Sequence, residues 1–87
     1  LGEIENVYSK LSGGKYCVVM PFTNVQGNTE LAIIIEGKEY DYKAHFDAMA
    51  AIIPYYELPS KWLFIKNIPL NTNGKVDRKT IAKIFNL

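Results

Sequence analysis

Three short apolar runs constrain the fold most, because each has the length of a strand and not of a helix. They lie at residues 16–20 (YCVVM), 31–35 (LAIII) and 62–65 (WLFI). Their β-branched and aromatic side chains favour strands, and the first two runs have the continuous apolar character of buried strands. The polar, turn-rich residues 22–30 separate those two runs. The sequence therefore predicts an antiparallel pair joined by a loop, with Pro21 closing the first strand, and a third strand at residues 62–65.

Between and around these runs, apolar residues recur at three- and four-residue intervals, the spacing of one helical face. A first helix begins near Glu3 and stops at Ser12-Gly13-Gly14, with its apolar positions at Ile4, Val7, Tyr8 and Leu11. A second helix is predicted over residues 42–53, with Asp41 as its N-cap and Pro54 at its end. The apolar positions of this helix are Tyr42, Phe46, Met49 and Ile53. A short last helix is capped by Asp77, with inward positions at Ile81, Ile84 and Phe85.

These elements predict one α+β domain spanning residues 1–87, with about three strands, mainly antiparallel, and two to three packed helices. The aromatic residues Tyr42, Phe46, Trp62 and Phe64 are expected in the core, whereas Tyr55 and Tyr56 either line an interdomain surface or are simply exposed. An Asn-Gly pair at Asn73-Gly74 is a strong hairpin signal, because both central residues of a type I′ turn need positive φ. Lys75 would then lie at the tip of a protruding turn.

Composition excludes several classes of protein. The chain has 87 residues, of which 48% are hydrophobic, so it is too apolar for a disordered tail. No run reaches the roughly 18 apolar residues of a membrane span, and no signal peptide opens the chain. A single cysteine, Cys17, and a single histidine, His45, allow no disulfide and no metal cage. We therefore expect a cytoplasmic domain without a metal site, cut from a longer chain.

Charge is distributed unevenly along the chain. Residues 1–60 carry four basic and eight acidic side chains, a net −4, whereas residues 61–87 carry six basic and one acidic, a net +5. The last third is where an anion would bind. Solvated lysines that keep the domain soluble explain the same excess. A non-catalytic module that docks an acidic carrier protein or a nucleic acid is a further interpretation, although no nucleic-acid recognition motif is present.

Residues 68–79 (IPLNTNGKVDRK) resemble the closing motif of the adenylate-forming superfamily, which includes acyl-CoA synthetases, peptide-synthetase adenylation domains and luciferases. The common form is LPLTPNGKVDRK, from which this chain departs at Asn71 and Thr72. Residues 1–5 (LGEIE) resemble the opening of the family's C-terminal subdomain, and residues 54–60 (PYYELPS) its PDYMVPS segment, with departures at Tyr55 and Glu57. The three segments follow in the family's order and spacing across the whole chain.

The resemblance implies the mobile C-terminal lid of a two-step ligase. A carboxylate, here an amino acid or another acyl group, first attacks ATP to give an acyl-adenylate, and a pantetheine thiol of coenzyme A or a carrier protein then takes the acyl group. ATP and Mg²⁺ would be bound mainly by a large N-terminal adenylation domain, so this chain alone should be inactive. The segment GKVDRK favours an amino-acid ligase coupled to a carrier protein. After adenylation the lid would rotate and present the face near Gly2 and Glu3.

Lys75 is the predicted catalytic residue. A fixed cation offsets the repulsion between a carboxylate and a triphosphate, and lysine carries a compact charge on a long stem. Together with Lys75, the resemblance places Gly74 and Asn73 at the nucleotide, although Gly74 supplies backbone freedom and Asn73 is also a simple turn former. Asp77 is expected to be structural. Arg78 and Lys79 contact the nucleotide, the large domain or a carrier protein, or face water.

Overall fold

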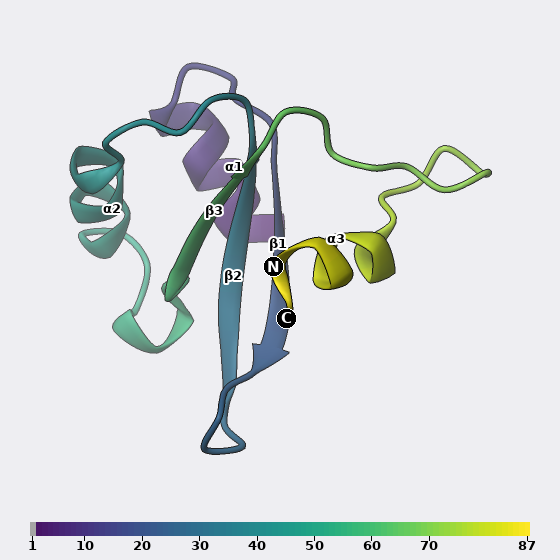
Figure 1. Cartoon of the computed structure of the whole chain (residues 1–87). Coiled ribbons are helices and arrows are strands. Elements are labelled where there is room, and N and C mark those ends of the chain that lie inside the picture. The colour runs from purple at the N-terminus through teal and green to yellow at the C-terminus, as the bar shows by residue number, and fades with distance from the viewer. Residues whose placement is uncertain (1) are drawn as a thin grey trace.

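The computed structural model describes residues 2–87 and contains a single mixed sheet with helices on both faces (Figure 1). In chain order the elements are α1 (Gly2–Leu11), β1 (Cys17–Thr23), β2 (Thr29–Glu36), α2 (Lys43–Ala50), the 3₁₀ helix η1 (Tyr55–Glu57), β3 (Lys61–Ile65) and α3 (Arg78–Phe85). The predicted α+β class is confirmed. Within the described part of the chain, no helix combines the length and the apolarity needed to cross a bilayer.

The sheet has the strand order β1-β2-β3, and its pairing corrects one prediction. β1 pairs antiparallel with β2, as expected, with Val19 opposite Ile33. β2 pairs parallel with β3, with Ile33 opposite Trp62, so the sheet is mixed and not mainly antiparallel. The physical reason is the connection over residues 37–60, which contains α2. It is long enough to carry the chain back to the end of the sheet where β2 begins, so that β3 runs in the same direction as β2.

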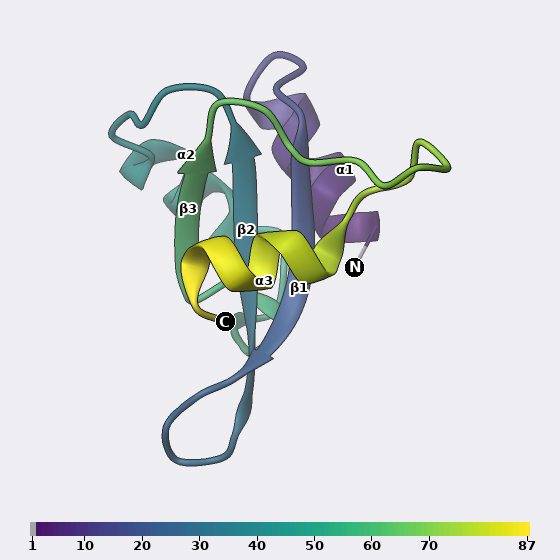
Figure 2. The same ribbon diagram turned by 45° about the vertical axis from the view of Figure 1, so that its right-hand side comes forward.

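Both faces of the sheet are buried, which explains why the strand runs are continuously apolar. α1 and α2 cover one face and α3 covers the other (Figure 2). The first core layer includes Tyr8, Met49 and Trp62, and the second includes Ile34 and Ile81. All four central residues of β2 from Ala32 to Ile35 have no exposed surface. The sheet therefore provides a rigid base on which the remaining segments are mounted.

Pro21 does not close the first strand, because it lies on an exposed edge of the sheet. β1 continues to Thr23, and Pro21 pairs with Leu31. The outward backbone groups of Val19 in β1 are bonded to side chains: Val19 N–H donates to Glu5 Oε2 (2.7 Å), and Arg78 Nη1 donates to the Val19 carbonyl (3.3 Å). Outward residues recur every second position, so the missing N–H of Pro21 faces away from β2 and costs no ladder bond.

The second helix is shorter than predicted. It spans Lys43–Ala50, Tyr42 is its N-cap without a side-chain cap bond, and the chain turns before Ile53, which is still buried. Asp41 nevertheless contributes, since its Oδ1 accepts from the Lys43 N–H at 3.1 Å. Apolar spacing placed Tyr42 inside the first turn of the helix. The Tyr42 ring stacks on the Trp62 ring, with the ring centroids 4.5 Å apart.

The last helix begins as predicted, with Asp77 as its cap. The Asp77 carboxylate accepts from the Thr80 N–H at 3.1 Å, and this bond lowers the pKa of Asp77 below its ordinary value. Ile81 is fully buried and Phe85 packs beside it. Ile84 was wrongly expected to face inward: it is 54% exposed, and Ala82 packs against this core layer.

We predict that Asp77→Ala lowers the melting temperature of the domain by several degrees at neutral pH, because the first turn of α3 loses its acceptor. The folded-state pKa of Asp77 is depressed, so its contribution is complete above the unfolded pKa of about 3.9 and is lost as the pH falls through the folded value. Thermal melts followed by circular dichroism between pH 7 and pH 2 should show the difference between wild type and variant vanishing in acid. A difference that persisted at pH 2 would contradict the charged cap.

Candidate functional site

The segment that carries Lys75 is a loop between β3 and α3, and it extends away from the sheet and helices (Figure 1). Its base is fixed on both sides. Ile68 is buried under α3, and its N–H donates to Glu36 Oε2 at 2.8 Å. On the other side, Asp77 N–H donates to the Pro69 carbonyl at 2.9 Å, and an isolated bridge pairs Leu70 with Val76. The outer part, residues 71–75, is exposed.

The turn in this loop differs from the predicted type I′ turn centred on Asn73-Gly74. Among the non-glycine residues described, only Asn86 has a positive φ, so Asn73 does not meet the type I′ requirement. Gly74 N–H donates instead to the Asn71 carbonyl at 3.0 Å, and Gly74 has a φ of +77°. These features fit a type I turn that starts at Asn71 and is followed by a left-handed glycine bulge.

The three residues that the sequence assigned to the nucleotide are thus neighbours in one exposed turn. Asn73 N–H donates to Asn71 Oδ1 at 2.8 Å, and Asn73 is exposed. A Cβ at Gly74 would meet nothing within 4 Å, so glycine is needed there for its backbone conformation and not for space. Within residues 2–87, the Lys75 ammonium forms no salt bridge with a described carboxylate. This turn can therefore present one cation to a molecule outside the domain.

Two of the other basic residues of the last third, Arg78 and Lys61, differ from Lys75 because they have contacts within the domain. Arg78 donates to the Val19 carbonyl on the edge of β1, and Lys61 Nζ lies 4.8 Å from the ring centroid of Phe22. Both contacts are structural and tie these side chains to the domain. Arg78 is nevertheless exposed, so the expectation that it also contacts the nucleotide, the large domain, a carrier protein or water stays a prediction.

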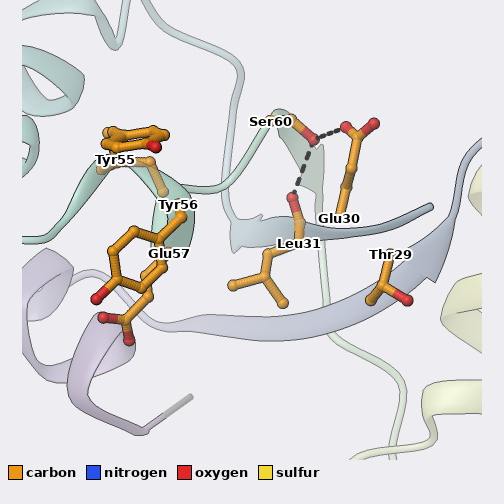
Figure 3. Close-up of a pocket in the computed structure, with 8 residues that line it drawn as sticks. Thr29, Glu30, Leu31, Tyr55, Tyr56, Glu57 and Ser60 are labelled. Carbon is orange, nitrogen blue, oxygen red and sulfur yellow. Dashed lines mark hydrogen bonds between the residues drawn. The ribbon is translucent and has the colours of Figure 1, made fainter.

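Three hollows described on the surface lie elsewhere. One groove of about 460 Å³ is lined by the 3₁₀ helix, where Tyr55 and Tyr56 are 85% and 74% exposed, and by the start of β2 (Figure 3). At one end of it Ser60 Oγ bonds to Glu30, which also accepts from Asn24, and these bonds lower the pKa of Glu30. Sequence reasoning missed this cluster, whose members are far apart in the chain. Lys75 lines neither this groove nor the two hollows of about 410 and 510 Å³.

The single histidine and cysteine both belong to the packing. Tyr40 hydroxyl lies 2.6 Å from His45 Nδ1 and 2.7 Å from the Tyr8 hydroxyl, so His45 joins an aromatic cluster. Cys17 is 5% exposed in the core layer under α1. Among the described residues, no three His, Cys, Asp or Glu side chains are grouped to hold a metal ion.

Cys17 gives a simple check of the burial. Desolvation, with a smaller contribution from the nearby Glu5 charge, raises its pKa to about 12, so at pH 8 almost no thiolate is present. We predict that a thiol reagent labels Cys17 only after urea unfolds the domain. The measurement is the absorbance released by a chromogenic disulfide reagent with and without urea. Rapid labelling of the native chain would show that β1 opens far more easily than its packing implies.

Comparison with known proteins places this geometry in a family. No protein-family model matches the chain. Surfactin synthase subunit 1 of Bacillus subtilis is 32% identical over 83 residues, which are 95% of this chain and 2% of that protein. The D-alanine–D-alanyl carrier protein ligase of Listeria monocytogenes is 30% identical over 93 residues, which are 99% of this chain and 18% of the ligase. The chain thus spans less than a fifth of these relatives.

Solved structures agree with the sequence relatives. A four-domain nonribosomal peptide synthetase bound to AMP and glycine matches with a TM-score of 0.80 and 31% identity, over 91% of this chain and 6% of that one. A fatty acyl CoA synthetase of Mycobacterium tuberculosis has the same fold, with a TM-score of 0.79 at 22% identity, over 95% of this chain and 17% of that one. The homologous segments are the C-terminal regions of adenylation domains, and the chain fits a C-terminal subdomain of such enzymes. The resemblance drawn from the three sequence motifs is confirmed.

Proposed function

We propose that this chain is the mobile lid of an ATP-dependent ligase that activates a carboxylic acid as its adenylate. The observation that carries the proposal is the exposed Lys75, held on a projecting loop of a chain homologous to the C-terminal part of such ligases. Lys75 lines none of the three hollows described among residues 2–87, so the ammonium would act in a cleft supplied by a large N-terminal domain.

The chemistry assigned to Lys75 is electrostatic. When a carboxylate attacks the α-phosphate of ATP, two anions must approach, and negative charge develops on the phosphate oxygens as pyrophosphate leaves. A lysine ammonium placed between the carboxylate and the phosphate stabilises that arrangement. The flexible side chain and the projecting backbone let the cation enter another domain while α3 and the sheet stay folded.

The relatives also suggest the second half-reaction. One of them is a D-alanine–D-alanyl carrier protein ligase, and the peptide synthetase structure contains AMP and glycine. We infer that the acceptor is a pantetheine thiol, of a carrier protein or of coenzyme A, and that an amino acid is the substrate to test first. The net +5 of residues 61–87 would complement an acidic carrier protein, although Lys61 and Arg78 are already engaged within the fold.

The experiment is ATP–pyrophosphate exchange by the full-length protein, measured with separate pools of amino acids and fatty acids. We expect exchange that depends on one pool and that is lost when residues 1–87 are deleted. The isolated 87-residue chain should give no exchange. Exchange that is unaffected by the deletion would overturn the proposed role of this domain, and the absence of exchange with every acid would overturn the proposed reaction.

A further inference from the structure

Asn71 holds the backbone of Lys75 on both sides. Lys75 N–H donates to Asn71 Oδ1 at 3.1 Å, and the Lys75 carbonyl accepts from the Asn71 N–H at 2.7 Å. The same Oδ1 accepts from Asn73 at 2.8 Å, and the Asn71 carbonyl accepts from Gly74 at 3.0 Å. One residue therefore makes four of the hydrogen bonds that shape the exposed turn.

The β1–β2 turn contains a second copy of this arrangement. Asn24 Oδ1 accepts from Gln26 at 3.0 Å and from Asn28 at 2.9 Å, while Asn24 N–H donates to the Asn28 carbonyl at 2.8 Å. Gly27 N–H donates to the Asn24 carbonyl at 2.9 Å, and Gly27 has a φ of +85°. Position for position the two loops read N-x-x-G-N and N-x-x-G-K. The turn at residues 24–28 connects β1 to β2, and it has the neutral Asn28 at the position that corresponds to Lys75.

We propose that Asn71 is the positioning residue of Lys75, an inference that rests on the function proposed for the lysine. The outer loop is exposed and is joined across its base by one bridge, Leu70 with Val76. Without the Asn71 Oδ1, the backbone N–H groups of Asn73 and Lys75 form hydrogen bonds with water instead. The backbone at Lys75 then samples other conformations. The fold keeps its stability, because no apolar surface is lost. The ammonium, at the end of a long side chain, is delivered to the reacting oxygens in a smaller fraction of molecules, and small misplacements are costly in catalysis.

The test uses ATP–pyrophosphate exchange by the full-length enzyme with four variants. N71A should lower kcat for exchange about tenfold while the KM for the acid changes by less than about twofold, because the two lost hydrogen bonds are neutral and exposed. N71T should recover most of the rate, since its hydroxyl also accepts from backbone N–H groups of a turn. N24A removes the same device, and also the bond to Glu30, at a site remote from the lysine loop, so its rate should stay within about twofold of wild type. K75A is the reference for loss of the lysine itself.

A double variant separates positioning from general stability. If Asn71 acts only through Lys75, adding N71A to K75A lowers the residual rate by less than about twofold. A wild-type rate in N71A, an equal fall in N24A, an N71T as slow as N71A, or a further large fall in the double variant would each overturn the positioning role. A K75A enzyme with near wild-type exchange would overturn the function proposed for the lysine, whatever N71A does.

Discussion

Replacing Lys75 by alanine in the full-length enzyme should reduce ATP–pyrophosphate exchange about a hundred- to a thousandfold, the usual effect of removing one group that stabilises developing charge. The effect should fall mainly on kcat, because the ammonium is needed most where the carboxylate and the phosphate approach each other. The domain itself should stay as stable as wild type, because Lys75 is exposed and forms no salt bridge with a described carboxylate. Melting curves of both proteins check that expectation.

The matched control is K83A, which removes the same charge from an exposed position on α3. It should leave exchange within about twofold of wild type, because it changes only the long-range field, which salt screens. A second control is the thioester step started from supplied acyl-adenylate, which should tolerate K75A if a different face of the lid serves that step. Equal losses in K75A and K83A would reduce the role of Lys75 to bulk charge and contradict a placed catalytic cation.

The fold was largely predictable because its signals are local. Short β-branched runs, the glycines after Leu11 and the Asp77 cap each act within a few residues, and each was interpreted correctly. The errors have a long-range cause. The direction of β3 depends on how the chain crosses back with α2, and Pro21 is tolerated only because β1 lies at an edge of the sheet. Neither fact is visible in a window of neighbouring residues.

At the candidate site the exposure of the Lys75 segment was predictable, but the geometry of its turn was not. The Asn-Gly pair drew attention to the wrong turn, since the residue that starts the turn is Asn71, three positions before the glycine. The useful signal was the spacing of Asn and Gly, which the chain repeats from Asn24 to Gly27. The groove beside Tyr55 could not be derived from sequence, because Glu30 and Ser60 are brought together only by the sheet.

The largest expected effect on stability is that of Trp62→Ala. Trp62 is 8% exposed and lies among three rings: Tyr42 is stacked on it at 4.5 Å, and Tyr8 and Phe46 meet it edge-on at 5.8 and 6.1 Å. Truncating such a side chain typically costs about 3–5 kcal/mol. Native domains are typically stable by only about 0.05–0.15 kcal/mol per residue, so this loss is a large fraction of the total and W62A should be strongly destabilised.

Trp62→Phe is the informative companion, because Trp62 Nε1 is buried without a hydrogen-bond partner among the described residues. Phenylalanine keeps an aromatic ring against Tyr42 and removes an N–H that is desolvated without compensation, so W62F should cost only about 1 kcal/mol. Tyr55→Ala, at an 85% exposed aromatic residue, should change the free energy of unfolding by less than about 0.5 kcal/mol. The measurement is urea unfolding followed by far-UV circular dichroism, since the substitutions at position 62 remove the only tryptophan fluorophore. If W62F were as unstable as W62A, the indole N–H would have to be bonded in solution, and the packing described for this face of the sheet would be incomplete.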